Sequence, residues 1–262
     1  MQTVIFCGGK GTRISGSGPE KKELFQIGSR PILWHIMKTF AAFGHKEFVL
    51  PLGHRGDLIR RYFLEYAWHA RDICFRLGSP DDAVCYGEND ESDWQLTMVD
   101  TDREAGPEGI EVNKGERIRR ISSYLTGERF FLTYGDGVGD IDVDALLRFH
   151  AAHGKWVTVT GIQPAYNFGV LDTDEDDRVT AYRQYPPLDH WINAGFYVVE
   201  RSALDHLKPG WDWESDFLVW LAQTDQLMIY RHTGFWRKMD TLKEAQQLND
   251  IWASGQAPWK VW

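Results

Sequence analysis

The chain is poor in cysteine. It has three in 262 residues, Cys7, Cys74 and Cys85, and they show no CxxC spacing. An odd number of cysteines without paired spacing argues against a disulfide framework and against a cysteine zinc site. Proline and glycine occur at ordinary frequencies, with 10 and 25 residues, so the composition also argues against a disordered chain.

Long hydrophobic runs are missing as well. No stretch approaches the roughly 18 consecutive apolar residues of a membrane span, so we expect no membrane partner. The first apolar run covers only residues 3–6 before glycines begin, which is too short for a secretory signal peptide. We therefore expect a protein of the reducing cytoplasm.

Excess positive charge is the third absence. Lys and Arg total 29 against 38 Asp and Glu, which gives a net charge of −9. Proteins that bind nucleic acid or membrane surfaces without specificity are usually basic, so we expect neither partner. A local cluster of cations in such an acidic chain therefore indicates a specific site.

The sequence does contain an alternation of strand-like and helix-like segments. Hydrophobic residues make up 43% of the chain, enough for a core, and its length fits one domain over 1–262. Helical spacing predicts helices at 31–43, 58–66, 143–154 and 240–255. Apolar runs predict strands at 3–6, 47–52, 94–100, 129–137, 155–162, 191–200 and 226–232, with a short strand or turn at 24–28. Polar, glycine-bearing segments predict loops at 80–92 and 100–116.

This rhythm over the first ~160 residues predicts an α/β fold, with a mostly parallel sheet and helices on both faces. Pro31 suits the first turn of its helix and Gly44 suits its end. Several of the 12 tryptophans lie near the C-terminus, two of them in "APWKVW". There we expect packing of a subdomain or a subunit contact, since buried aromatic side chains mostly supply area.

The stretch "FCGGKGTRISGSGPEKKELF" at 6–25 follows the first strand directly. Its bare backbone N–H groups would stand at the carboxyl edge of a parallel sheet, where such groups bind phosphate oxygens. Arg13 and Lys22 add cations that suit a polyphosphate. The spacing matches neither the P-loop nor the dinucleotide-binding fingerprint.

"GGKGTR" followed by Lys22 resembles the G-x-G-T-R…K-P signature of the sugar-phosphate nucleotidylyltransferase family. The resemblance extends through "RPILWHIMKTF", "YGDGVGDID", "FGVLD", "INAGFYV", "GFWRKMDTL" and "APWKVW". In order and spacing these segments look like the bacterial glucose-1-phosphate cytidylyltransferases, along essentially the whole chain.

The resemblance implies a Rossmann-like nucleotidyltransferase fold and transfer of a nucleotidyl group with release of pyrophosphate. It implies CTP as donor, a phosphorylated small molecule as acceptor, Mg²⁺ as cofactor and a homo-oligomer. It also implies a nucleotide-binding half over about 1–160 and, over about 161–262, an acceptor-binding part with a small portion for sugar binding or oligomerisation.

The same resemblance implies roles for particular residues. Arg13, Lys22, Asp136 and Asp240 are expected to be catalytic, with Asp136 and Asp240 as the metal ligands. Asp240 also precedes a helix and suits a cap there. The expected nucleotide-binding residues are Cys7, Gly8, Gly9, Gly11, Thr12, Arg13, Lys22, Arg117 and Gly135.

Gly169, Asn193 and Glu214 match positions that line the sugar pocket in that family. Tyr185 stands where the family has the lysine of "EKP", which holds the sugar phosphate. Arg183 or His190 can replace that cation, or the acceptor differs from glucose 1-phosphate; we favour the second interpretation.

Three alternatives to this function stay open at the level of sequence. The donor can carry another base, or the acceptor can be a polyol phosphate or a phosphonate. The chain can also be a catalytically silent regulator that binds nucleotide or sugar, which the missing lysine favours. The two expected metal carboxylates argue against that last alternative, because a pure binder does not need them.

Overall fold

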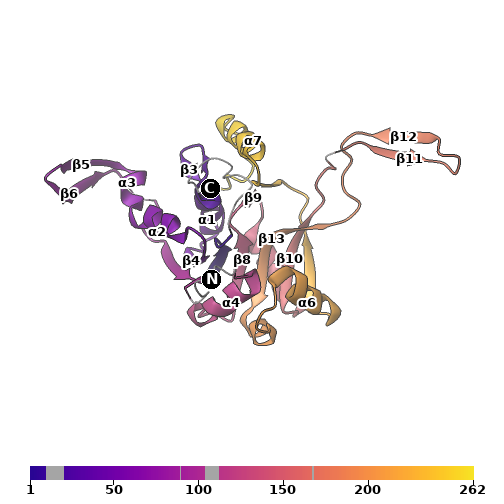
Figure 1. The fold of residues 1–262 in the computed structure, drawn as a ribbon, viewed down its shortest axis with the longest axis horizontal. Helices are drawn as coiled ribbons and strands as arrows, with labels where there is room; N and C mark the ends of the chain where they lie inside the picture. Colours follow the sequence, from indigo (N-terminus) through magenta and orange to yellow (C-terminus); the bar gives the residue numbers. More distant parts are fainter. Residues whose placement is uncertain (10–20, 89, 104–111, 167) are drawn as a thin grey trace.

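The computed structural model of the chain describes residues 1–9, 21–88, 90–103, 112–166 and 168–262. Their centre is a seven-stranded sheet in the order β14-β10-β13-β8-β1-β4-β7 (Figure 1). The strands are β1 (Gln2–Phe6), β4 (Glu47–Leu52), β7 (Gln95–Asp100), β8 (Arg129–Tyr134), β10 (Val157–Ile162), β13 (Ile192–Glu200) and β14 (Leu227–Arg231).

The sheet is mixed but mostly parallel. Strand β1 pairs in parallel with β4 and β8, β4 with β7, and β10 with β14. Only β13 runs against its neighbours, β8 and β10. The carboxyl ends of the six parallel strands therefore meet at one edge, and the predicted fold class is confirmed.

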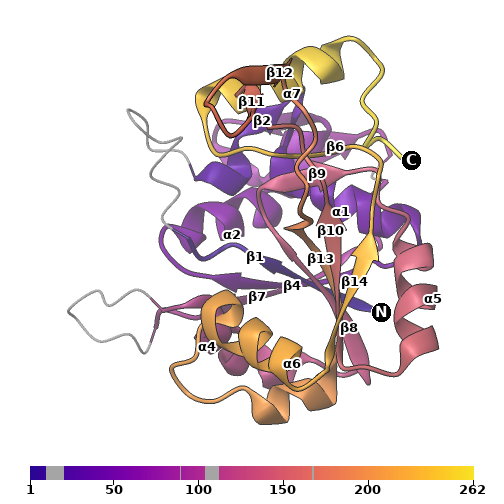
Figure 2. The same ribbon diagram turned by 90° about the vertical axis from the view of Figure 1, so that its right-hand side faces the viewer.

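Helices cover both faces of this sheet (Figures 1 and 2). Ile5 belongs to one buried core with residues of α1 (Ile32–Ala42), α5 (Val143–His153) and α7 (Leu242–Ala253). Its neighbour Val4 belongs to a second core with α4 (Lys114–Ile121), η4 (Trp213–Leu218) and α6 (Val219–Gln223). Successive side chains of a strand point to opposite faces, so β1 is buried on both.

Local sequence explains where the long helices begin and end. Asp142 caps α5, because its side chain accepts a hydrogen bond from the Ala145 N–H at 2.7 Å. Gly154 follows that helix in the left-handed conformation that favours glycine. Pro31 stands at the cap of α1, one position before the helix, and Gly44 has a positive φ just beyond its end.

The aromatic C-terminus packs within the molecule. Trp259 is fully buried, stacks on Phe235 at 5.5 Å between ring centroids and lies beside Trp252. Its indole N–H points to Nδ1 of the buried His35 on α1, at 3.4 Å. The packing role expected from the sequence is confirmed for Trp259.

Two hairpins project from opposite sides of the body (Figure 1). The first pairs β5 (Asp72–Arg76) with β6 (Ser79–Tyr86), and the second pairs β11 (Val170–Thr173) with β12 (Val179–Arg183). We call them the first arm and the second arm. The loop predicted over 80–92 is wrong for its first part, since Ser79–Tyr86 is a strand. Proline and two aspartates in "SPDDAVCY" hide the alternation that indicates a strand.

Short elements complete the described chain. They are η1 (Lys22–Leu24), β2 (Gln26–Ile27), β3 (Arg30–Pro31), α2 (Gly56–Leu64), α3 (Tyr66–Ala70), η2 (Ser122–Tyr124), β9 (Gly137–Gly139), η3 (Arg201–His206) and β15 (Trp236–Lys238). The helix predicted at 58–66 is two helices separated at Glu65. Helix α4 begins at Lys114, inside the loop predicted over 100–116. Among the described residues no helix is long and apolar enough to cross a membrane.

Candidate active site

The candidate site lies where the parallel strands end. Gly8 follows β1, Gly53 follows β4, and the Gly135–Asp136 turn follows β8. The Gly135 N–H donates to the Phe6 carbonyl at 3.2 Å, which ties the loops after β1 and β8 together. An added Cβ on Gly135 would stand 2.8 Å from that carbonyl, so only glycine fits without a shift.

A short strand pair brings Asp136 and Asp240 to one place. Strand β9 follows Asp136 and pairs antiparallel with β15, with Gly137 opposite Lys238. The Met239 N–H donates to the Asp136 carbonyl at 2.8 Å. The Asp240 N–H is held by the Glu244 carboxylate at 2.7 Å. Thr241, not Asp240, caps α7, so Asp240 keeps its side chain for the site.

Lys22 lies between these two carboxylates. Its Nζ donates to Asp136 Oδ2 at 2.6 Å and also to Asp240 Oδ1. Burial opposes ionisation of Asp240, but hydrogen bonds from Lys22 and Lys238 outweigh it and lower the Asp240 pKa to about 2. Burial likewise disfavours the Lys22 ammonium, yet Asp136 and Asp240 raise its pKa. Lys22 and Asp240 are therefore charged at neutral pH.

Two carboxylates around a cation suit Mg²⁺ in a particular way. Among the described residues there is no group of three His, Cys, Asp or Glu that would hold a metal ion unaided. Magnesium commonly takes one or two carboxylates and completes its shell with water and substrate phosphates. Asp136 and Asp240 fit that donor set, and Lys22 shows that the position between them accepts positive charge.

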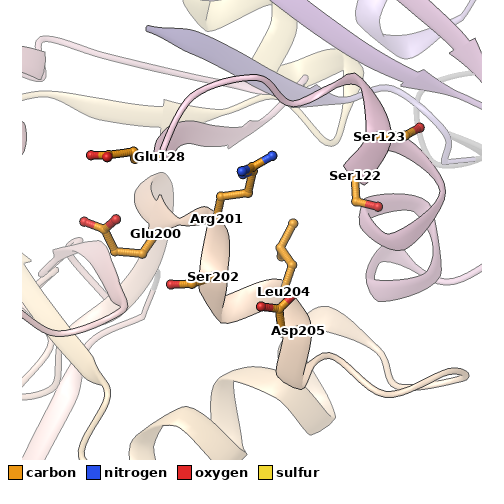
Figure 3. A pocket seen from close by; sticks show the side chains of 8 residues that line it. All are labelled: Ser122, Ser123, Glu128, Glu200, Arg201, Ser202, Leu204 and Asp205. Carbon is orange, nitrogen blue, oxygen red and sulfur yellow. The ribbon is translucent and has the colours of Figure 1, made fainter.

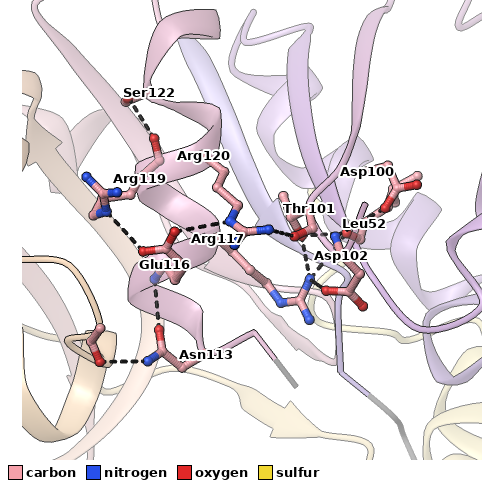
Figure 4. Close-up of polar contacts among 11 residues, drawn as sticks. Leu52, Asp100, Thr101, Asp102, Asn113, Glu116, Arg117, Arg119, Arg120 and Ser122 are labelled. Atoms are coloured by element: carbon pink, nitrogen blue, oxygen red, sulfur yellow. Dashed lines mark hydrogen bonds and ion pairs between the residues drawn. The ribbon is translucent and has the colours of Figure 1, made fainter. Parts of the chain in front are cut away.

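Arg117 shapes the loop after β1, and Figure 4 shows its contacts with Leu52, Thr101 and Asp102. Its guanidinium donates to the Gly8 and Leu52 carbonyls at 3.2 Å and forms an ion pair with Asp102 at 2.8 Å. Arg117 is only 3% exposed. The structure places this predicted nucleotide-binding residue behind the loop. An added Cβ on Gly8 would stand 2.4 Å from the guanidinium, so a larger residue there would displace Arg117.

Of the other predicted loop residues, the structure describes Cys7 and Gly9. Cys7 is buried, and burial together with the charge of Glu23 raises the pKa of its thiol well above the usual value, so it is not a nucleophile. Gly9 is exposed at the edge of the site. Gly11, Thr12 and Arg13 lie outside the described residues.

Two of the predicted acceptor residues meet in one hydrogen-bonded cluster. Glu214 Oε1 accepts from the Tyr134 hydroxyl at 2.7 Å, and that hydroxyl lies 2.9 Å from the Tyr197 hydroxyl. Asn193 Nδ2 donates to the Tyr197 hydroxyl at 2.5 Å. Lys114 Nζ donates to the same Glu214 oxygen at 2.6 Å. This acceptor cluster begins two residues before Asp136.

Sequence reasoning missed Tyr134, Tyr197 and Lys114. Tyr134 and Tyr197 fall within "FFLTYGDGV" and "INAGFYV", where their phenol groups looked like ordinary strand residues. Burial is the first cause that raises the pKa of both, to about 12 for Tyr197, so both stay neutral donors. Lys114 had no signal, because its contact with Glu214 is made only in the folded chain.

Comparisons with known proteins decide the family. Residues 2–218 match the family described as nucleotidyl transferase. The chain belongs to this family. It is 38% identical over 266 residues to the glucose-1-phosphate cytidylyltransferase of Salmonella typhi, and 37% identical over 265 residues to a probable one of Bacillus subtilis. Both alignments cover 100% of each chain.

Solved structures show the same fold at lower identity. HddC from Yersinia pseudotuberculosis superimposes with a TM-score of 0.66 and 18% identity, over 96% of this chain and 99% of that one. A putative glucose-1-phosphate thymidylyltransferase from Bacillus anthracis gives 0.66 and 14%, over 96% and 94%. The chain is thus a nucleotidyltransferase enzyme built on the fold that this family shares.

The remaining predicted acceptor residues of this nucleotidyl transferase lie on or beside the second arm. An added Cβ on Gly169 would stand 2.3 Å from the Tyr182 hydroxyl. Arg183 Nη2 donates to Asp172 at 2.9 Å within the arm, and Tyr185 is 58% exposed. The structure does not place these residues in the acceptor cluster of Asn193 and Glu214, because the arm projects away from the sheet (Figure 1).

A cavity of the nucleotidyl transferase lies elsewhere. It has a volume of about 650 Å³ and lies at the opposite edge of the sheet, where β8 begins and β13 ends (Figure 3). Glu128, Glu200 and Asp205 line it together with Arg201. Such an acidic wall repels phosphate groups. The edge of the sheet where the parallel strands end therefore remains the candidate site.

Proposed function

We propose that this nucleotidyl transferase moves CMP from CTP to a sugar 1-phosphate or a similar phosphorylated small molecule, giving a CDP-linked product and pyrophosphate. The observation that carries the proposal is the meeting of Lys22, Asp136 and Asp240 beside the glycine loop. The full-length similarity to cytidylyltransferases supports the choice of cytosine. The reaction would belong to the cytoplasm.

An acceptor phosphate oxygen would attack the α-phosphorus of CTP in line. The new P–O bond forms as the bond from the α-phosphorus to the bridging oxygen breaks, and that oxygen leaves with pyrophosphate. The nucleophile is already anionic, so the site needs neither a general base nor a covalent intermediate. Mg²⁺ held by Asp136 and Asp240 would neutralise phosphate charge.

The chain's own residues would bind and orient the two substrates. Lys22 would add a point charge at the phosphates, and Arg13 would contact the triphosphate from the loop. Residues of about 1–160 would supply the nucleotide half. The other expected contacts there are at Cys7, Gly8, Gly9, Gly11, Thr12 and Gly135, and Arg117 would act from behind the loop through the Gly8 carbonyl. Residues 161–262 would supply the acceptor half.

The acceptor cluster would read the acceptor's hydroxyl groups. One carboxylate oxygen of Glu214 already accepts hydrogen bonds from Tyr134 and Lys114. A sugar hydroxyl can donate to the other oxygen, and Asn193 can contact a second hydroxyl. Gly169, Arg183 and Tyr185 would act from the second arm.

The two arms support a homo-oligomer. All residues of β5 and β12 are exposed, and so are Phe75, Leu77 and Tyr182. A two-stranded hairpin is marginally stable alone and usually gains from packing on a further surface. Apolar side chains gathered on such a hairpin are typical of protein contacts. We infer that the arms pack on other copies of this chain.

A pyrophosphate-release assay tests the proposed reaction. The purified chain is incubated with Mg²⁺, each of CTP, UTP, dTTP, GTP and ATP, and a panel of sugar 1-phosphates and polyol phosphates. We expect release with CTP and at least one sugar 1-phosphate, and none from an Asp136→Asn variant. Comparable kcat/KM for UTP or dTTP would move the assignment to another base, since a pocket that binds the cytosine amino group leaves buried groups unpaired with uracil.

A further inference from the structure

Two buried cations hold two successive carbonyls of the glycine loop. The Gly8 carbonyl accepts from Arg117 Nη2 at 3.2 Å, and the Gly9 carbonyl accepts from Lys21 Nζ at 2.5 Å. Arg117 is 3% exposed and Lys21 is 2% exposed. The cations come from α4 and from the segment before η1, so two distant parts of the chain fix one short piece of backbone.

The Gly9 N–H lies between these two held carbonyls in the chain, so holding both of them also fixes that N–H group. A peptide unit is planar and trans, so its carbonyl and the N–H of the next residue point in opposite directions. The Gly8 carbonyl is turned toward the buried Arg117, and the N–H of Gly9 is therefore turned away from it. Gly9 is exposed at the carboxyl edge, where converging N–H groups bind anions.

Lys21 is matched by a buried acid. Glu23 Oε2 lies 3.5 Å from Lys21 Nζ, and Glu23 is 6% exposed. That oxygen has no hydrogen-bond partner within the part of the chain that the structure describes. An added Cβ on Gly135 would stand 2.8 Å from Glu23 Cγ, so the acid lies directly beneath the turn that leads to Asp136. The Lys21–Glu23 pair thus joins the loop after β1 to the turn after β8.

We propose that Lys21 is a positioning residue for the donor triphosphate, acting through the Gly9 carbonyl, with Glu23 balancing its charge. This inference rests on the proposed function but concerns a residue that does not touch substrate. Lys22 differs from its neighbour because it contacts the two site carboxylates, and its side chain is 12% exposed against 1% for Lys21.

The experiment separates positioning from simple charge balance. Lys21→Met leaves Glu23 buried without its cation, and we expect a lower melting temperature. The double variant Lys21→Met with Glu23→Gln removes both charges with little change of volume, and we expect it to recover the melting temperature. Lys46→Met is the control, since Lys46 is exposed and pairs with Asp93 on the surface.

The decisive readout is CTP binding by titration calorimetry with the acceptor left out. We expect both Lys21 variants to bind CTP about tenfold more weakly, because a loop N–H that is no longer held would lose its hydrogen bond to a charged phosphate oxygen. Lys46→Met should bind CTP like wild type. If the double variant recovers both its melting temperature and wild-type CTP affinity, Lys21 is only structural and the proposal is wrong.

Failure of the proposed function looks different. If wild type releases pyrophosphate with no nucleotide in the panel, the reaction assignment fails. The loop can then be tested with whichever nucleoside triphosphate wild type binds best. Equal affinity of wild type and the double variant for that nucleotide would again overturn the inference.

Discussion

At the scale of single residues, partners rather than position in the sequence separate Lys21 from Lys22. Both sit in "EKKELF", and the family resemblance pointed to Lys22. Lys22 meets Asp136 and Asp240, whereas Lys21 meets Gly9 and Glu23. Removing Lys21 would leave Glu23 buried without its cation, which is costly. The two lysines should therefore fail in different ways when substituted.

The two carboxylates carry the first prediction. Asp136→Asn and Asp240→Asn should each abolish turnover, because an amide keeps the side chain's shape but loses the charge that Mg²⁺ and Lys22 require. Pyrophosphate release with CTP measures the rate, and circular dichroism checks that the fold is kept. A near-normal rate in Mg²⁺ for either variant would show that its residue is not a metal ligand.

Tyr185 carries the second prediction. It stands where related enzymes are expected to have a lysine on the acceptor phosphate, and losing that contact costs about 1.5–3 kcal/mol, roughly tenfold to a hundredfold in affinity. We expect wild type to use glucose 1-phosphate poorly and Tyr185→Lys to use it better, with a lower KM and unchanged CTP affinity.

Acceptor kinetics check this expectation. Tyr166→Lys is the matched control, because Tyr166 is a partly exposed tyrosine near the base of the same arm. Efficient use of glucose 1-phosphate by wild type, with no better acceptor in the panel, would contradict the prediction. So would an unchanged KM in Tyr185→Lys.

At the scale of elements, the site depends on pairings that no local pattern reveals. Periodicity predicted the strands and helices of the central sheet, because each buries a face whose period is local. The pairing of β9 with β15 joins residues about a hundred apart, and it is this pairing that sets Asp136 beside Asp240. Both residues were predicted from the sequence only through a family resemblance. Lys114 on α4 was missed for the same reason, because no pattern in the sequence around it indicates its contact with Glu214.

Helix α1 carries a buried group whose titration can be measured. His35 is fully buried, its Nε2 lies 2.9 Å from the Ile27 carbonyl, and Trp259 donates toward its Nδ1. Nε2 is therefore the protonated nitrogen of a neutral ring. Burial, with a smaller contribution from the charge of Arg30, lowers the His35 pKa to about 4.

The third prediction follows from that depressed pKa. In the unfolded chain His35 is protonated below its usual pKa of 6.5. In the folded protein it stays neutral until the pH falls to about 4. Stability is thus lost as the pH falls from 6.5 to 4, by about 3 kcal/mol for this group. His35→Gln should flatten that part of the curve.

Urea unfolding of wild type and His35→Gln at several pH values measures the difference. The difference is needed because Glu23, whose pKa burial raises to about 7, contributes with the opposite sign over much the same range. His54→Gln is the control, since His54 is exposed and follows β4. Parallel curves for wild type and His35→Gln would show that the pKa of His35 is not lowered in the folded protein.

At the scale of the whole molecule, the arms are the parts that the body does not explain. The central sheet is buried on both faces by its own helices, and the C-terminal tryptophans pack inside. The arms instead extend from opposite sides of the body, and β5 and β12 are exposed on both faces (Figure 1). Their sequences give no indication of what covers them, and in "SPDDAVCY" of the first arm even the alternation of a strand is hidden. A chain with two such projections can contact two neighbours at once, which favours a closed ring or a larger assembly over a simple dimer.

The fourth prediction is that the arms hold the assembly together. Burying one large apolar side chain contributes about 1.5–3 kcal/mol, so replacing several on one arm should break a contact made by that arm. Phe75→Ser with Leu77→Ser and Tyr86→Ser on the first arm, and Leu171→Ser with Tyr182→Ser on the second, should each lower the molar mass measured by light scattering. Tyr124→Ser is the control, since Tyr124 is 47% exposed on the body and away from both arms. Circular dichroism should be the same for all variants, because the arms add nothing to the central core. A monomeric wild type, or arm variants with the mass of wild type, would show that the exposed hairpins have another purpose.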